Sequence, residues 1–182
     1  MHAPTHIMSG WCVGNLFRLT AGERVFCMIA ASAADVDAVS RLFGEEAYWN
    51  WHHVAGHNLA FAVLLSTGLA LCSTHRLKGY FVYLALAHLH LVLDYFGSGP
   101  GWAIRYGWPL FEWDWQNADA WEFSSWQNRV AALVLLVWVL GIAVICGRTP
   151  VELLTPDLDR RVVARLRRLV GWGRSEAAAD VP

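Results

Sequence analysis

The sequence predicts an all-α integral membrane protein: a helical bundle of about four to five apolar helices, with a long tryptophan-rich outer loop and a C-terminal amphipathic helix. Two features of composition support this fold class. Hydrophobic residues make up 56% of the 182 residues and charged residues only 16%, and the chain has 11 tryptophans. A third observation is the pattern: apolar runs alternate with short polar segments that hold nearly all the charges.

The first two apolar runs, Ile7–Phe17 and Val25–Ala34, are shorter than the ~20 residues that a full membrane span needs. They predict a hairpin of short or tilted helices. Gly10 and Gly14 stand four residues apart in the first run, a spacing that lets two helices approach closely.

The next three apolar runs predict full spans over Val54–Ser73, Tyr80–Phe96 and Arg129–Cys146. Asp35–Trp51 is polar and aromatic, which is typical of the membrane–water interface. The segment Gly97–Trp126 is rich in glycine and tryptophan and is too long for a simple connector, so we expect it to form a cap or lid.

After the last span, Thr155-Pro156-Asp157 predicts a helix start, and Asp159–Trp172 reads as a basic amphipathic helix lying on an anionic membrane surface. The predicted organisation is therefore a membrane-embedded domain over residues 1–148, a cytoplasmic helix over 149–174 and a disordered tail over 175–182.

The distribution of basic residues predicts the orientation. Eleven of the 14 Lys and Arg residues fall on one side of the membrane if the two short turns and the C-terminal segment share that side. By the positive-inside rule this side is cytoplasmic. The formal net charge of −1 argues against nucleic acid as a partner. The four cysteines lie far apart in apolar stretches and are expected to be small buried hydrophobic residues: Cys12, Cys27, Cys72 and Cys146.

The most informative stretch is Leu84–Phe96, an apolar run that carries three ionisable side chains. His90 and Asp94 are one helical turn apart and share a face, whereas His88 points to roughly the opposite side. Ionisable groups in a membrane helix are costly and usually face the protein interior. A His/Asp pair suits a divalent metal, although a buried hydrogen bond between helices is the simpler alternative.

Other candidate ligands fall at the same, outer end of the predicted bundle. They occupy the ends of four separate helices: His6, Asp35, Asp37, His52, His53, His57, His90 and Asp94. Because Lys and Arg alone defined the topology, this coincidence is independent evidence, and it predicts a site with more than one metal ion. Imidazoles and carboxylates without a cysteine suit zinc, manganese or iron(II). Such ions can lower the pKa of a bound water towards ~7 and hold a phosphoryl oxygen.

These residues resemble a known family. Thr5-His6, Asp35-Val-Asp37, His52-His53-Val-Ala-Gly56-His57 and His90-Leu-Val-Leu-Asp94 occur in the order and spacing of the bacterial membrane-bound metal-dependent hydrolases of the YdjM/YbcI type. The resemblance covers about residues 4–110. That family is similar to zinc-dependent phospholipase C and related nucleases, so the resemblance implies hydrolysis of a phosphoester, with a membrane lipid as one candidate substrate.

The resemblance implies a role for each matching residue. The expected metal ligands are His6, Asp35, Asp37, His52, His57, His90 and Asp94. Asp35 and His53 are expected to be catalytic, and His53 to bind substrate. Outside the family motifs, Arg105 is a candidate substrate-binding residue, and Asp114 and Glu122 in the same outer loop are alternative candidates to reach the site. The sequence departs from the family pattern at four places: Ala34 replaces Pro, His53 replaces Arg, Ala55-Gly56 replaces Gly-x-Thr and Asn58 replaces Ser. The lost Arg would have been a bidentate phosphate partner.

Two other functions remain open at this stage. Paired histidines on facing helices can ligate haem in an electron-transfer subunit, although the aspartates in the same layer disfavour it. The chain can also be a non-catalytic membrane subunit, with a structural metal or none.

Overall fold

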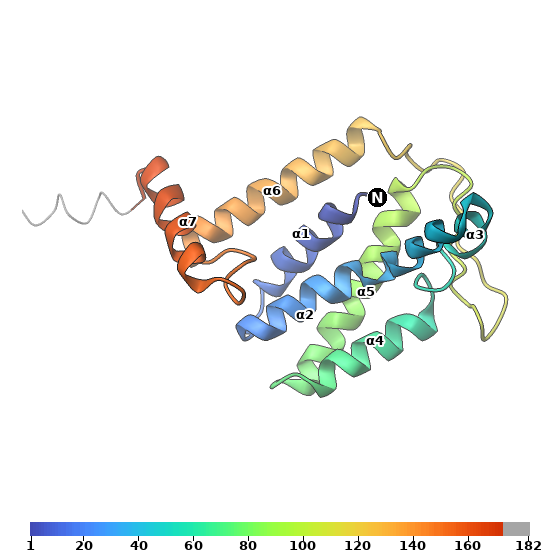
Figure 1. Cartoon of the computed structure of the whole chain (residues 1–182), viewed down its shortest axis with the longest axis horizontal. Coiled ribbons are helices and arrows are strands. Elements are labelled where there is room, and N and C mark those ends of the chain that lie inside the picture. Colours follow the sequence, from blue (N-terminus) through green and yellow to red (C-terminus); the bar gives the residue numbers. More distant parts are fainter. Residues whose placement is uncertain (173–182) are drawn as a thin grey trace, which may run out of the picture.

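In the computed structural model, which describes residues 1–172, the chain is helical and this described part contains no β-strand (Figure 1). The all-α prediction is therefore confirmed. The elements in chain order are α1 (Ala3–Gly14), α2 (Ala21–Ser32), the 3-10 helix η1 (Ala33–Phe43), α3 (Glu45–Trp51), α4 (Leu59–Leu71), α5 (Arg76–Gly97), α6 (Trp126–Cys146) and α7 (Pro156–Leu169).

Two helices, α5 and α6, are long and apolar enough to cross a membrane. The helix α4 has 13 residues, and α1 and α2 have 12 each, so each is ~18–20 Å long against a ~30 Å hydrocarbon layer. The predicted full span over Val54–Ser73 is therefore wrong. Its first five residues form turns, because Asn58 caps the helix by accepting a hydrogen bond from the Phe61 amide at 2.8 Å. The expected bundle of four to five membrane-crossing helices is not confirmed.

The helix α5 lies at the centre of the molecule, in contact with α1, α2 and α4 (Figure 1). The tightest helix pair is α1 with α2. A Cβ built on Gly10 would lie 2.5 Å from the Cys27 carbonyl oxygen, so only glycine allows this approach. The close approach predicted from the Gly10/Gly14 spacing is confirmed. It places the first residues of α1 beside the last residues of α2 and α5.

The start of α6 is tied to the end of α5 by one buried amide. Asn128 donates to the Gly97 carbonyl at 2.8 Å, and its side chain is fully buried. Beyond this point α6 packs mainly on α1 and leaves most of its apolar surface exposed, as a lipid-facing helix does.

The segment between α5 and α6 is irregular, as expected for the predicted loop, and it folds back over the start of α4. Ile104 pairs with Trp115 in an isolated bridge, and the Tyr106 carbonyl accepts from the Leu59 amide at 2.9 Å. The Trp102 ring stacks on Trp49 of α3 with centroids 4.3 Å apart. The sequence did not predict η1 or α3 as helices; both are short and precede the loop that carries His52, His53 and His57.

At the opposite end, α7 begins at Pro156 in its first turn, as predicted, and packs against α6 (Figure 1). The predicted disordered tail, 175–182, lies outside the described residues. Two cysteines contradict the expectation of burial: Cys72 and Cys146 are exposed at the ends of α4 and α6, whereas Cys12 and Cys27 are buried.

Candidate metal centre

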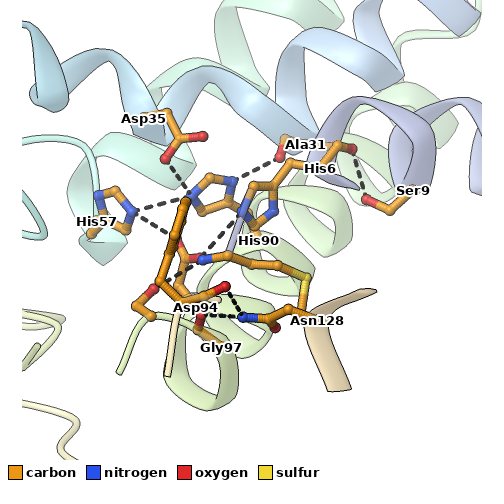
Figure 2. A network of polar contacts seen from close by, with 12 residues as sticks. His6, Ser9, Ala31, Asp35, His57, His90, Asp94, Gly97 and Asn128 are labelled. Atoms are coloured by element: carbon orange, nitrogen blue, oxygen red, sulfur yellow. Dashed lines mark hydrogen bonds and ion pairs between the residues drawn. The ribbon is translucent and has the colours of Figure 1, made fainter. Parts of the chain in front are cut away.

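One end of the molecule gathers histidines and aspartates from four parts of the chain (Figure 2). His6 comes from the first turns of α1, where the close α1–α2 contact places it beside α5. Asp35 and Asp37 lie on η1, which continues α2. His52, His53 and His57 lie in the turn before α4, and His90 and Asp94 in the last turns of α5.

Asp94 is the centre of this cluster. Its Oδ1 lies 3.2 Å from His6 Nε2, and its Oδ2 lies 3.2 Å from His57 Nε2 and 3.0 Å from His90 Nε2. All four side chains are buried. The contact with His90 confirms that residues four apart on α5 share a face. A carboxylate whose two oxygens face different imidazoles is suited to bridge two metal ions.

The Nε2 atoms of His57 and His90 face each other. In His90, Nδ1 lies 2.8 Å from the Ala31 carbonyl, which can only accept, so this nitrogen carries the proton. In His57, Nδ1 lies 2.8 Å from the Asp37 carboxylate and is likewise the donor. Both Nε2 atoms are therefore lone-pair acceptors when the rings are neutral, yet they lie 3.1 Å apart and each contacts Asp94. An added proton or a metal ion between these nitrogens would stabilise the arrangement.

A first group of possible ligands consists of His6, Asp35, His90 and Asp94, with one ligand atom from each lying within 4.8 Å of the others. The Asp35 Oδ1 lies 3.7 Å from His90 Nε2, and its Oδ2 is buried without a hydrogen-bond partner. The Nδ1 of His6 also has none, although its ring stacks on His90 at 3.9 Å. Buried polar atoms are normally hydrogen-bonded, so the unpartnered Asp35 Oδ2 and His6 Nδ1 are suited to bind a further ligand.

A second group joins Asp37, His52 and His57. Asp37 accepts from His52 Nδ1 at 2.7 Å, from His57 Nδ1 at 2.8 Å and from the Gly56 amide at 3.1 Å. Burial by itself raises the pKa of Asp37, but the two histidines outweigh it and hold the pKa below its ordinary value. As placed, Asp37 orients His57, as carboxylates behind metal-bound histidines do. Direct metal binding by Asp37 and His52 stays a prediction.

The pKa of His57 also indicates that its surroundings favour positive charge. Its burial lowers the pKa, but hydrogen bonds to Asp37 and Asp94 raise it to about 9. In the absence of a metal, the ring is therefore protonated at neutral pH. A metal ion would supply that charge instead.

His53 completes a third group with His57 and Asp94. Its Nε2 lies 3.9 Å from Asp94 Oδ2, and its Nδ1 is buried without a partner. Burial, together with the neighbouring His57, lowers the pKa of His53 well below its ordinary value, so this ring is neutral. Its backbone φ of 65° lies in the left-handed region, which is unusual for a residue other than glycine.

A cavity of about 250 Å³ opens onto the cluster. Asp35, His53 and Asp94 contribute to its polar part, and three aromatic side chains contribute to its walls: Tyr48, Trp102 and Phe123. These aromatic residues come from α3 and the long loop. The sequence predicts an interfacial position for Tyr48 and a cap or lid for the segment that contains Trp102 and Phe123, but no local pattern shows that the two segments meet here.

No sequence pattern pointed to Met1, whose amino nitrogen donates to Asp94 Oδ1 and to Ser98 Oγ at 3.0 Å. The guanidinium of Arg105 is directed elsewhere and pairs with Asp114 at 2.9 Å on the exposed loop, so its substrate role stays a prediction. His88 points away from the cluster and contacts the Leu84 carbonyl of its own helix and the Tyr106 hydroxyl of the long loop.

The comparison with known proteins supports the resemblance found in the motifs. The family model described as "YdjM inner membrane protein" matches residues 1–169, nearly the whole chain. No curated protein and no solved structure shows significant similarity. The matched region includes every histidine and aspartate of the cluster, so the chain belongs to the YdjM inner membrane protein family.

Proposed function

We propose that the protein is a membrane-embedded, metal-dependent hydrolase that acts on a phosphoester, with a membrane lipid as one candidate substrate. The observation that carries the proposal is the pair of facing acceptors, His57 Nε2 and His90 Nε2, 3.1 Å apart beside the buried Asp94 carboxylate. Two lone pairs and a carboxylate form a donor set suited to a divalent cation.

The donor set favours zinc, or another divalent ion such as manganese, and has room for more than one ion because both Asp94 oxygens are used. When bound, such ions activate water at neutral pH and neutralise charge on a phosphoryl group. The proposed ligands are His6, Asp35, His57, His90 and Asp94. Asp37 and His52 stay as further candidates.

The protein's own groups supply orientation and proton transfer. Asp35 lines the cavity with a buried oxygen that has no protein partner, and is placed to accept a proton from a bound water. His53 is neutral and lines the same cavity, so it can donate to or accept from a substrate oxygen without adding charge. The aromatic walls fit a phosphoester that carries an apolar group.

In the predicted orientation the basic end is cytoplasmic and the cluster lies towards the outer face of the inner membrane. The substrate would then be reached from the outer leaflet or from the periplasm. This placement combines the family's inner membrane location with the charge distribution, and it is tested below by labelling.

The haem alternative has less support from the geometry. The Nε2 atoms of His6, His57 and His90 all converge on one carboxylate within 3.2 Å, and all three rings are buried. This packing suits small ions better than the broad plane of a porphyrin between two imidazoles. A Soret band in the purified protein would reverse that judgement.

The test is metal content by mass spectrometry, followed by hydrolysis of bis(p-nitrophenyl) phosphate and of a fluorescent phospholipid. We expect at least one equivalent of metal in the wild type and a clear loss in His90→Ala. His88→Ala is the matched control, because it removes a histidine from the same helix outside the cluster. Less than one equivalent in the wild type would overturn the proposal. Full metal without hydrolysis of either substrate would leave a structural-metal subunit as the better description.

A further inference from the structure

The end of the molecule opposite the metal centre contains a second polar cavity, of about 550 Å³. It lies where α1 ends, α2 begins and the chain leaves α6, the lower left region of Figure 1. Four cationic or titratable side chains line it and no carboxylate does: Arg18, Arg24, His75 and Arg148. We propose that this cavity binds a phosphate group, as carried by an anionic phospholipid of the cytoplasmic leaflet or by free phosphate.

Two of the four side chains already contact an acid. Arg24 Nε donates to Glu152 at 2.7 Å, and His75 Nδ1 contacts Glu23 at 3.1 Å. The other two, Arg18 and Arg148, are therefore the arginines available to a bound anion.

Arg18 and Arg148 form no ion pair with any acid among residues 1–172. The Arg148 Nε is buried without a hydrogen-bond partner, which is costly for a charged group. A guanidinium in this state is suited to a phosphate, because its planar donors match two phosphate oxygens.

The surroundings favour a phosphate near a membrane. Leu16 and Phe17 are exposed apolar residues at the cavity, suited to contact the glycerol and acyl part of a lipid. Asn15 Oδ1 is buried there without a partner and can accept from a headgroup hydroxyl. Lys78 and the arginines of α7 lie at the same end of the bundle and add to its positive field. The site is independent of the proposed hydrolase activity.

The test uses full-length protein in nanodiscs that hold equal amounts of an anionic and a zwitterionic phospholipid, with retained lipid measured by native mass spectrometry. We expect the wild type to retain the anionic lipid selectively. The double variant Arg18→Gln/Arg148→Gln should lose at least about tenfold in retention, since each removes a charge-assisted hydrogen-bonding group. Arg18→Lys/Arg148→Lys should retain an intermediate amount.

The matched control is Arg161→Gln/Arg165→Gln, which removes two exposed charges from α7 at the same end but outside the cavity. It should retain the lipid almost as well as the wild type. Equal loss in the two glutamine pairs would overturn the proposal in favour of general surface attraction, and so would unchanged retention in Arg18→Gln/Arg148→Gln.

A second measurement separates the two sources of phosphate and does not depend on the double variant folding. The thermal midpoint of the wild type and of the single variant Arg148→Gln is compared in phosphate and in chloride at equal ionic strength. A rise in phosphate that is specific to the wild type supports the site with free phosphate as ligand, and selective lipid retention without such a rise supports the lipid. Neither effect in the wild type would overturn the proposal.

Discussion

At the scale of single residues, the candidate centre depends on which nitrogen of each histidine carries the proton. Ala31 and Asp37 determine this for His90 and His57, because a carbonyl and an ionised carboxylate can only accept. The free nitrogens then point at Asp94. The spacing of the motif places these residue types at one end of the helices, but the direction of each ring depends on partners far away in the sequence.

His53 offers the sharpest test of a catalytic residue. Its φ of 65° suits glycine, so His53→Gly removes the ring without straining the backbone, and its metal content is measured alongside its activity. Because a positioned acid or base contributes ~10²–10⁴-fold, hydrolysis of bis(p-nitrophenyl) phosphate should fall by at least ~100-fold. Wild-type activity at equal metal content would remove His53 from the mechanism.

At the scale of elements, the α1–α2 contact places His6 in the cluster. Gly10→Ala would push a methyl group against the Cys27 carbonyl and the Met28 Cα, both under 3.0 Å from the new Cβ. We expect a loss of ~1–3 kcal/mol in stability, the usual cost of overpacking, and a lower metal content. The measurement is thermal unfolding in detergent.

Gly22→Ala in α2 is the control for this substitution. A Cβ there meets nothing within 4 Å, and alanine is the better helix former. Its midpoint should equal or exceed that of the wild type. If both variants lost the same stability, the close contact at Gly10 would not be the reason.

A second element-scale feature joins α2 to the turn before α5. Glu23 is buried, accepts from the Thr20 amide at 2.8 Å in a capping box, and accepts from the His75 amide at 2.8 Å. Burial raises the pKa of Glu23, but the hydrogen bonds from Thr20 and His75 outweigh it and lower the pKa from 4.5 to about 2.

The sign of the pH dependence follows from this depressed pKa. The stabilisation, on the order of 3 kcal/mol, is complete above pH 4.5 and is lost as the pH falls towards 2. The difference in thermal midpoint between the wild type and Glu23→Gln should therefore shrink from pH 6 to pH 3. A difference that stays constant over that range would show that the carboxylate charge does not contribute.

At the scale of the whole molecule, groups of different charge lie at opposite ends of the helices: the acidic and imidazole cluster at one end, the basic cavity and α7 at the other. The positive-inside rule assigns the basic end to the cytoplasm. Labelling of exposed cysteines can test this orientation, because Cys72 and Cys146 lie at the basic ends of α4 and α6.

A membrane-impermeant maleimide should therefore label the protein in inside-out vesicles and not in intact spheroplasts. Ser124→Cys, in the outer loop just before α6, should show the opposite pattern in a background lacking Cys72 and Cys146. Labelling of the native cysteines in spheroplasts would invert the orientation and place the candidate centre on the cytoplasmic side.

Local sequence patterns were sufficient to predict most of the long helices and one contact of the candidate site. Apolar runs predicted helices near α1, α2, α5 and α6, because burial and lipid exposure are encoded residue by residue. The four-residue spacing of His90 and Asp94 predicted their contact, because a helix places such residues on one face. The glycine spacing predicted a close helix pair for the same reason.

Tertiary structure decided the rest, because the deciding contacts join residues far apart in the chain. The apolar run Val54–Ser73 predicts a membrane span, but Asn58 caps the helix, so His57 lies before it in a turn. There it contacts both Asp37 and Asp94. The aromatic walls of the cavity and the Met1 contact with Asp94 depend on which distant segments fold next to each other. Hydrophobic periodicity within a segment does not predict this. The sequence by itself therefore determined which residue types could meet at this end, and only the packing of α1, η1 and α5 decided which atoms face one another.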